Sequence, residues 1–348
     1  RSLILTAINA GADVITANKA LLAHHGPEIF EAAAQVGAQV FYEAAVAGAI
    51  PIIRPLRESL AGDRVHRILG IVNGTTNFIL DRIDTLGEPM EAALAMATEL
   101  GYAEADPTAD IEGFDAAQKA SILASLAFHT HVPVDKVYRE GITGVTLEQV
   151  QEARKAGYVV KLLAIAERVI GPDGSEGVSA RVYPAMVPLG HPLAAVHGAY
   201  NAVFVEAEAA GSLMFYGAGA GGIQTASAVL GDLVTAARRH VIGGPGVAES
   251  THATFPILPI SAIHTRYHVS LEIKDAAGAL AEIASLFAKH GVSVESVEQK
   301  TATDGSLTAT LVIGTHEAIE ADLAATVEAL SASPVVERVS GVLRVEGL

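Results

Sequence analysis

The sequence GYAEADPTADIEGFDAAQKASILASLAF, residues 101–128, changes character along its length. Its first nineteen residues hold five carboxylates and one cation, Lys119, whereas the residues after Lys119 carry no charge. The Gly, Asp and Pro residues of the first half favour turns, and residues 114–128 are expected to form a helix. Asp115 and Lys119 lie four residues apart, so they share one face of that helix. The stretch therefore predicts an acidic loop that leads into a buried helix with a lysine at its entrance.

The residue types alone allow more than one interpretation of this stretch. A lysine that lies beside a carboxylate and is partly removed from water can donate or relay a proton, but such a pair is also common on helix surfaces. Glu112 and Asp115 could complement the helix dipole, and Asp110 could cap the helix. Clustered carboxylates also suit Mg²⁺ or Ca²⁺, although Lys119 would place an unfavourable positive charge beside the ion.

Composition narrows the class of protein. The chain has 348 residues and a formal charge of −16, so its length suits two or three domains. Its acidity argues against nucleic acid or an anionic membrane as the main partner. The absence of cysteine excludes disulfides and cysteine-ligated zinc, and it fits a cytoplasmic protein. No apolar run reaches the roughly 18 residues of a membrane span, and no signal peptide is visible.

Residues 1–45 alternate helical and strand patterns, which is typical of parallel βαβ units. Helices are predicted over 2–10 and 27–37, and strands over 13–16 and 38–46. The sequence begins inside a helical pattern and without an initiator Met. We therefore expect this chain to be truncated within a domain.

The middle of the chain predicts a mixed α/β domain. A strand over 64–72 leads through the turn NGTTN, residues 73–77, into a helix over 78–85. Strand patterns fill most of residues 158–216, and a last helix is predicted over 223–240. The glycine-rich sequence that follows is typical of a linker.

The pattern restarts near residue 264. Strands are predicted over 266–275, 292–300, 306–315 and 335–345, and helices over 278–291 and 318–332. Strand, helix, strand, strand, helix, strand is the ferredoxin-like βαββαβ order. The C-terminal region is therefore expected to be a separate α+β domain.

The sequence ATELGYAEADPTADIEGFDAAQK, residues 97–119, resembles the homoserine dehydrogenase signature throughout, with Gly, Asp, Pro and Lys at matching spacings. The segments VITANKALLA, FYEAAVAGAIPII, GIVNGTTNFIL and GAGAGGIQTASAVLGDL are similar to other parts of the same family. Residues 264–348 resemble the ACT regulatory domain that many members carry.

The resemblance implies a fold and an activity. The fold would be α/β, or α+β overall, with residues 1–45 as the C-terminal remnant of a Rossmann nucleotide-binding domain. Residues 46–245 would form the catalytic, substrate and dimerisation domain, whose helix 222–240 returns to the nucleotide side. Residues 246–263 would be a linker and residues 264–348 the ACT domain. The activity would be the NAD(P)-dependent interconversion of L-homoserine and L-aspartate 4-semialdehyde, in threonine and methionine biosynthesis. Homodimers or homotetramers, with threonine as the ACT effector, would be usual.

The resemblance also implies roles for single residues. Lys119 would be the acid/base group, with Asp115 beside it and Lys19 between cofactor and substrate. The substrate pocket would be formed by Glu104, on the substrate ammonium, with Asp110, Tyr102 and Thr75. The cofactor would lie against Asn18, Lys19, Gly101, Gly221 and Gly222. A monovalent cation, usually sodium, would be held by Glu43 and the backbone carbonyls of Val46, Gly48 and Ile50. Asp106 and Glu112 would remain as turn and cap residues.

One glycine motif is misleading in this context. GAGAGG, residues 217–222, matches G-x-G-x-x-G, but a dinucleotide fingerprint also needs a following strand with an acidic residue about 20 residues on. The sequence there is the glycine-rich VIGGPGVAE, so the motif is either a tight strand-to-helix turn or a helix N-terminus that approaches the cofactor from the far side. Without the true fingerprint, the sequence does not decide between NAD and NADP. It also leaves a non-catalytic paralogue, which senses amino acids or assembles, as the alternative function.

Overall fold

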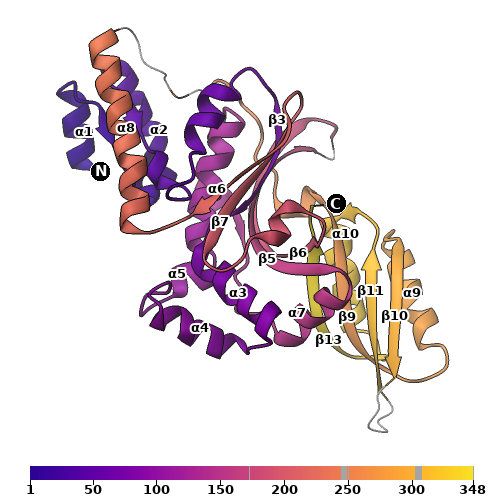
Figure 1. Ribbon diagram of the computed structural model, residues 1–348. Coiled ribbons are helices and arrows are strands. Elements are labelled where there is room, and N and C mark those ends of the chain that lie inside the picture. Colours follow the sequence, from indigo (N-terminus) through magenta and orange to yellow (C-terminus); the bar gives the residue numbers. More distant parts are fainter. Residues whose placement is uncertain (172, 244–248, 250, 302–307, 348) are drawn as a thin grey trace.

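The computed structural model describes residues 1–171, 173–243, 249, 251–301 and 308–347 (Figure 1). The chain forms a helical N-terminal part, a central sheet covered by helices, and a C-terminal part made of a sheet and two helices. Within the predicted linker, residues 246–248 and 250 lie outside the described residues, and further along it Ile257 forms a β-bridge with Val178. None of the described helices is long and apolar enough to cross a membrane.

The N-terminal part contains a βαβ unit and a helix that returns to it late in the chain. Its elements are α1 (Ser2–Asn9), β1 (Val14–Ile15), α2 (Lys19–Val36), β2 (Val40–Phe41) and α8 (Gly222–Ile242). Strands β1 and β2 pair in parallel, as a βαβ unit requires. Helix α8 stands against this part (Figure 1), where Arg239 lies 3.1 Å from Asp13. The distant segment 222–242 therefore completes the packing of residues 1–45.

Two boundaries in this part differ from the sequence prediction. The helix predicted over 27–37 begins at Lys19, because the side chain of Asn18 accepts a hydrogen bond from the backbone N–H of Leu21 (3.0 Å) and caps the helix. Pro27 lies inside the helix. The strand predicted over 38–46 ends at Phe41, because the 3₁₀ turn Glu43–Ala45 follows directly.

The central sheet carries the long apolar strands. Its order is β6-β5-β3-β7-β8, with each neighbouring pair antiparallel. The strands are β3 (Val65–Ile71), β5 (Tyr158–Ile170), β6 (Glu176–Pro188), β7 (Tyr200–Ala207) and β8 (Gly211–Ala218). Strands β5 and β6 are buried along almost their whole length, which explains why their sequences are nearly continuous apolar runs. The sheet therefore provides a rigid base for the helices and loops on it.

Five helices cover this sheet or extend from it. They are α3 (Gly74–Leu86), α4 (Met90–Glu99), α5 (Thr108–Ile111), α6 (Phe114–Ala127) and α7 (Leu147–Lys155). Helix α6 packs directly on β5 and β6, so the apolar half of the opening sequence is buried as predicted. The residues predicted as a turn at 73–77 instead form the start of α3, because the side chain of Asn73 accepts from the backbone N–H of Thr76 (2.9 Å) and caps that helix.

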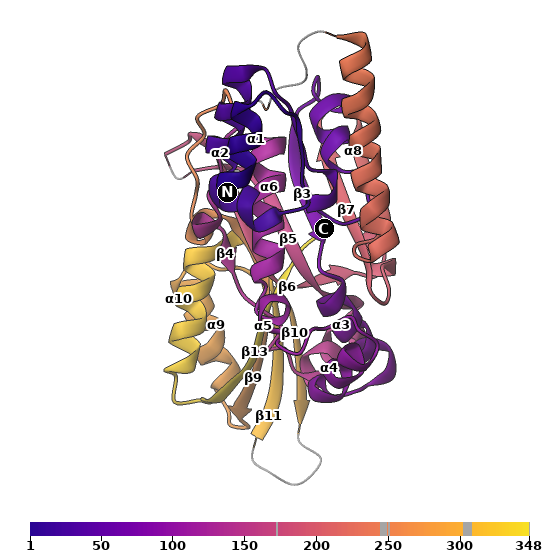
Figure 2. The same ribbon diagram turned by 90° about the vertical axis from the view of Figure 1, so that its left-hand side faces the viewer.

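The C-terminal part confirms the predicted βαββαβ order. Its elements are β9 (His264–Lys274), α9 (Ala279–Lys289), β10 (Val294–Thr301), β11 (Thr308–Thr315), the short β12 (Ala318–Ile319), α10 (Glu320–Ser331) and β13 (Val336–Val345). The antiparallel strand order is β10-β11-β9-β13, and both helices lie on one face of this sheet (Figure 2). Leu271, Ile283 and Phe287 belong to a core that is separate from that of the central sheet. This part therefore has a hydrophobic core of its own.

The two sheets are joined edge to edge. Strand β13 pairs in parallel with β6 over Arg344↔Ala185 and Val345↔Met186, so one sheet continues into the other. Behind this short pairing lies a buried group of charges around Arg181. Its guanidinium lies 2.6 Å from Glu167 and 3.6 Å from Glu346 of the C-terminal part. Buried charges are costly unless they are paired, so these contacts specify how the two parts meet.

Candidate active site

The acidic loop is more ordered than its turn-forming residues suggest. The carboxylate of Asp106 accepts a hydrogen bond from the backbone N–H of Thr108 (3.1 Å), at the start of α5. Helix α6 then begins after Gly113, whose φ of 78° lies in the left-handed region. Asp106 therefore has the predicted turn role.

The capping interpretation of Asp110 is wrong, whereas Asp115 lies in the first turn of α6 and Glu112 is the C-cap residue of α5. No side chain caps α6, and Asp110 instead accepts a hydrogen bond from the side-chain amide of Asn73 (2.7 Å). Glu112 follows α5, where its carboxylate accepts from the hydroxyl of Thr143 (3.0 Å). Among the described residues, no group of three or more His, Asp or Glu side chains has a metal-binding arrangement.

A cluster of opposite charges lies where the loop meets α6. The ammonium of Lys119 lies 2.7 Å from one oxygen of Asp115, and that of Lys19 lies 3.1 Å from the other oxygen. Lys119 also donates to the backbone carbonyl of Val72 (2.6 Å). Burial alone would raise the pKa of Asp115, but the two ammonium groups outweigh it and hold that pKa at about 2. The predicted lysine–carboxylate pair is therefore a three-membered cluster that includes Lys19.

Asn73 completes this cluster and was not predicted. Its side-chain amide donates to Asp115 (2.9 Å) as well as to Asp110, while its carbonyl oxygen caps α3. The residue is buried, with 6% of its surface exposed. One asparagine therefore fixes both carboxylates relative to the first turn of α3.

Most of the predicted site residues line one cavity of about 580 Å³. The predicted residues on its wall are Lys19, Gly48, Thr75, Gly101, Tyr102, Glu104, Asp110, Asp115, Lys119 and Gly221. The wall also includes residues that the sequence did not single out: Asn73, Gly74, Asn201, Ala199 and Thr225. Predicted residues that are not on the wall are Asn18, Gly222, Glu43, Val46 and Ile50. The structure thus brings together residues from seven segments of the chain.

One side of the cavity is formed by the loop after α4. The hydroxyl of Thr75 donates to the backbone carbonyl of Tyr102 (2.6 Å), and the ring of Tyr102 lies 5.0 Å from that of Phe78. Glu104 is exposed on the same wall, and among the described residues no group pairs with its carboxylate. This side of the cavity therefore carries the carboxylate of Glu104, unpaired among the described residues, next to a backbone segment that the hydrogen bond from Thr75 holds in place.

Another part of the wall is formed by the glycine turn before α8. A Cβ atom at Gly48 would lie 2.4 Å from the carbonyl oxygen of Gly219, so a side chain there would force the two segments apart. Gly221, with a φ of 124°, precedes the helix, and Gly222 is its first residue. Asn18 faces its own helix as the cap of α2. Both the tight turn and the helix N-terminus that the sequence suggested are therefore present here.

The segment predicted to hold a cation contributes Gly48 to this wall, whereas Glu43, Val46 and Ile50 do not line the cavity. Glu43 is buried, and its carboxylate accepts hydrogen bonds from the backbone N–H groups of Ile53 (2.7 Å) and Arg54 (3.0 Å). Burial raises the pKa of Glu43. Asp232 of α8 accepts from the backbone N–H of Glu43 (2.9 Å) and pairs with Arg54 (2.7 Å). The network connects α8 to the segment before β3.

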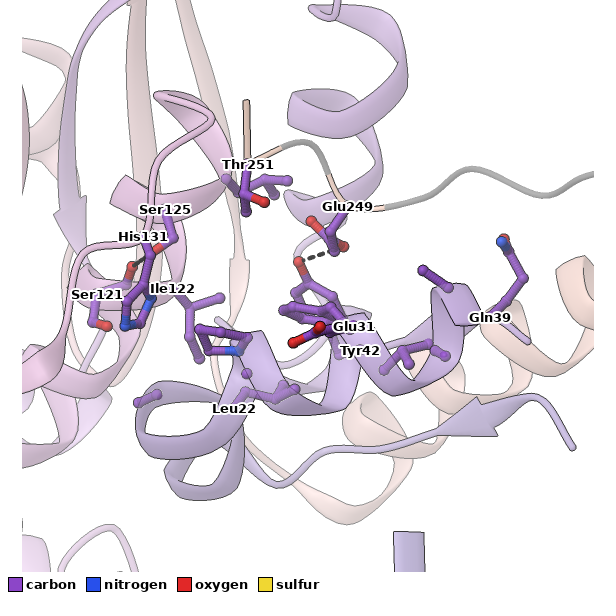
Figure 3. A pocket seen from close by; sticks show the side chains of 18 of the residues that line it. Leu22, Glu31, Gln39, Tyr42, Ser121, Ile122, Ser125, His131, Glu249 and Thr251 are labelled. Carbon is purple, nitrogen blue, oxygen red and sulfur yellow. Dashed lines mark hydrogen bonds between the residues drawn. The ribbon is translucent and has the colours of Figure 1, made fainter. Parts of the chain in front are cut away.

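A second cavity, of about 420 Å³, lies between α2, β2 and α6 (Figure 3). Its wall is mostly apolar, and the hydroxyl of Tyr42 donates to Glu249 (2.9 Å) at one end. None of the predicted site residues lines it. Of these two cavities, the predicted site residues therefore line only the first.

Comparison with known proteins agrees with this geometry. A family model described as homoserine dehydrogenase matches residues 51–234, its NAD-binding-domain model matches residues 1–43, and an ACT-domain model matches residues 267–334. The homoserine dehydrogenase of Mycobacterium tuberculosis is 56% identical over 350 aligned residues, which cover 100% of this chain and 79% of that protein. The chain belongs to the homoserine dehydrogenase family.

Solved structures support the same conclusion. A homoserine dehydrogenase from Thiobacillus denitrificans is 40% identical and superposes with a TM-score of 0.93, covering 99% of this chain and 79% of that one. A hyperthermophilic archaeal homoserine dehydrogenase mutant, solved in complex with NADPH, is 31% identical with a TM-score of 0.59 and covers 68% of each chain. The chain is therefore an NAD(P)-dependent oxidoreductase that interconverts homoserine and aspartate 4-semialdehyde, and it carries an ACT domain.

The low pKa of Asp115 predicts a pH dependence of stability. Because the folded-state pKa is about 2 and the ordinary value is 3.8, the pair stabilises the fold above about pH 4 and loses this contribution as the pH falls toward 2. Asp115→Asn should lower the free energy of unfolding by about 2 kcal/mol near pH 7 and by less near pH 2.5. Urea unfolding at several pH values measures this. Asp275→Asn, in an exposed loop, is the control. An equal loss at both pH values would contradict the assignment.

Proposed function

We propose that Lys119 is the acid/base residue of this homoserine dehydrogenase and that Asp115 holds its ammonium in place. An ammonium has three N–H donors. In Lys119, two of them are used by the carbonyl of Val72 (2.6 Å) and by Asp115 (2.7 Å). The third is left for a group in the cavity, whose wall Lys119 helps to form. This is the single observation that carries the proposal.

The proposed proton transfer follows from this arrangement. The bound nicotinamide cofactor supplies or accepts the hydride at the carbon that carries the reacting oxygen. In the reductive direction, an N–H of Lys119 gives its proton to the aldehyde oxygen, which becomes the alcohol. In the oxidative direction, the neutral amine takes the proton back. Lys19, 3.1 Å from the second oxygen of Asp115, is proposed to share this role at the cofactor side.

The substrate and the cofactor are proposed to occupy opposite sides of the cavity. Glu104, which has a free carboxylate, would pair with the substrate ammonium, with Asp110 nearby. Thr75 and Tyr102 would shape this side, because the bond between them fixes the loop. The cofactor would approach residues of the other side and of α2, namely Asn18, Lys19, Gly101, Gly221 and Gly222. Glycine allows close approach, and the N-terminus of α8 suits a phosphate, which supports this placement.

Removal of the lysine amine tests the proposed mechanism. Lys119→Ala in the full-length protein should lower kcat by ~10²–10⁴, the usual contribution of general acid/base catalysis. The affinity for the dinucleotide, measured by fluorescence titration, should be largely kept. Lys136→Ala, at an exposed position, is the matched control. Near-normal turnover by Lys119→Ala would remove this residue from the mechanism. Absence of homoserine oxidation by the unmutated protein would instead favour the non-catalytic alternative.

A monovalent cation, such as sodium, is proposed to bind at Glu43. The carbonyl oxygens of Val46, Gly48 and Ile50 accept no hydrogen bond from any described residue. The buried carboxylate of Glu43 keeps further lone pairs beyond the two that the backbone uses. Carbonyl and carboxylate oxygens are the ligands that hard cations prefer. The donor set therefore fits the ion, which would order the segment that contacts the glycine turn.

Exchange of the cation tests this proposal. Replacing sodium by tetramethylammonium at constant ionic strength should lower activity. Glu43→Gln should raise the sodium concentration needed for half-maximal activity by at least about tenfold, the scale on which losses at metal sites are measured. Glu58→Gln, at an exposed position, should leave the sodium dependence unchanged. Equal activity in both salts would contradict the cation site.

The ACT domain is proposed to bind threonine as a feedback effector. ACT domains are ligand-binding modules in the family that the sequence resembles, and the predicted strand-to-helix turn is formed here by Gly278, with a φ of 92°, before α9. Calorimetry on the full-length protein should show saturable heat with L-threonine and none with D-threonine. Absence of heat from a folded sample would contradict the role of threonine.

We expect a homodimer or homotetramer in the cytoplasm, where the dinucleotide and the amino-acid intermediates are available. The outer strand β8 ends the central sheet, and Leu230, Leu233 and Val234 are exposed on α8 beside it. An unpaired sheet edge with apolar residues nearby supports pairing with a second copy.

A further inference from the structure

A short segment, residues 138–143, lies between the acidic loop and the C-terminal part. It contains the two-residue strand β4 (Tyr138–Arg139), which pairs in parallel with β6 at Arg181 and Val182. The pairing continues with a hydrogen bond from the backbone N–H of Glu140 to the carbonyl of Val182 (2.8 Å). Successive side chains on a strand point to opposite sides. Residues 138 and 140 therefore face one way, and residue 139 faces the other.

Arg139 faces the acidic loop and holds its backbone. Its guanidinium donates to the backbone carbonyl of Glu112 and lies 3.6 Å from the centre of the Phe114 ring. These two loop residues lie between Asp110 and Asp115, the carboxylates that Asn73 binds. Arg139 therefore fixes the stretch of chain that spaces the two carboxylates.

The residues after Arg139 pack closely against the same stretch. The backbone N–H of Ile142 donates to the carbonyl of Ile111 (2.7 Å), and the hydroxyl of Thr143 donates to Glu112 (3.0 Å). A Cβ atom at Gly141 would lie 2.3 Å from the carbonyl oxygen of Ile111. The segment and the loop are thus in direct backbone contact, with no space for a side chain between them.

The other side of β4 holds the C-terminal part. Glu140 pairs with Arg344 of β13 (2.8 Å), and the Arg344 guanidinium lies 5.6 Å from the centre of the Tyr138 ring. Arg344 is anchored in its own part by Glu320 of α10 (2.6 Å), which also accepts a hydrogen bond from Tyr267 of β9 (2.7 Å). A shift of α10 or β9 therefore acts on β4 through one arginine.

We infer that Arg139 is a positioning residue for the substrate loop, and that β4 is the connection through which the ACT-bearing part adjusts that loop. The inference rests on the proposed substrate site, because it assumes that Asp110 and Asp115 serve the reaction. The two contacts are made by consecutive residues, Arg139 toward the loop and Glu140 toward Arg344. Movement of Arg344 reaches Glu112 through Glu140 and Arg139 without any flexible linker. The effector part therefore acts on the substrate side of the cavity and not on the dinucleotide side.

Steady-state kinetics of the full-length protein tests the positioning role. Arg139→Gln should raise the KM for homoserine about tenfold, the scale of one charge-assisted hydrogen bond, and leave the KM for the dinucleotide unchanged. Arg139→Lys should recover part of this loss, because an ammonium still donates to the carbonyl of Glu112. Arg338→Gln, which removes an exposed arginine paired within the C-terminal part, is the control. Equal increases in both KM values, or no increase for homoserine, would overturn the inference.

A double-mutant cycle tests the connection itself. Glu140→Gln, Arg139→Gln and the double variant are compared by their KM for homoserine, with and without threonine. The inference expects Glu140→Gln to change the KM only while Arg139 is present, and to weaken any effect of threonine. Glu337→Gln, whose partner Lys274 lies in the same part (3.7 Å), is the control. Additive effects of the two substitutions would overturn the connection.

One further variant separates this inference from the proposed function. Glu104→Gln removes a carboxylate from the cavity wall itself and should raise the KM for homoserine. If Glu104→Gln has no effect, the proposed substrate pocket is wrong, whatever Arg139 does. If threonine affects no variant, the effector proposal is wrong, while the cycle measured without threonine still decides whether β4 couples the two sides.

Discussion

The carboxylate of Asp115 is shared by groups from three segments of the chain. Lys119 reaches it from the same helix, Lys19 from the start of α2, and Asn73 from the end of β3. The helix on the nucleotide side, the central sheet and the apolar helix are therefore held at fixed distances around one anion. Because a buried charge is costly without partners, the segments cannot separate without losing this stabilisation. The shape of the adjacent cavity therefore depends on this electrostatic contact.

Strand β3 connects the Asp115 cluster to the C-terminal part of the molecule. At one end Arg67 pairs with Glu346 of the C-terminal part, and at the other the chain continues into Val72 and Asn73. The same sheet therefore carries the joint with the ACT-bearing part and the segment that holds Lys119 and Asp115. Strand β4 provides a second, shorter connection, which links the C-terminal part to the acidic loop. Both connections end on the part of the cavity wall that is proposed to bind the substrate.

Local features of the sequence predicted much of this structure. Apolar periodicity identified β5, α6 and the βαββαβ order, and the spacing of Asp115 and Lys119 predicted their pairing. Asn73 was not predicted because its partners, Asp110 and Asp115, lie 37 and 42 residues away in the sequence. In addition, the dipeptide Asn-Gly is typical of a turn. The early start of α2 was missed because Pro27 suggested a helix start, whereas the cap lies at Asn18. Long-range contacts of single polar residues leave no periodic signal.

The return of α8 to the N-terminal part has a consequence for the order in which the molecule is made. Asp13 meets Arg239, and Glu43 meets Asp232, across 226 and 189 residues of chain. A protein that emerges from the ribosome N-terminus first exposes α1 and α2 long before these partners exist. Closing so long a loop also slows folding. The nucleotide-binding side of this enzyme is therefore synthesised first, but its packing is completed only after the central sheet has been synthesised.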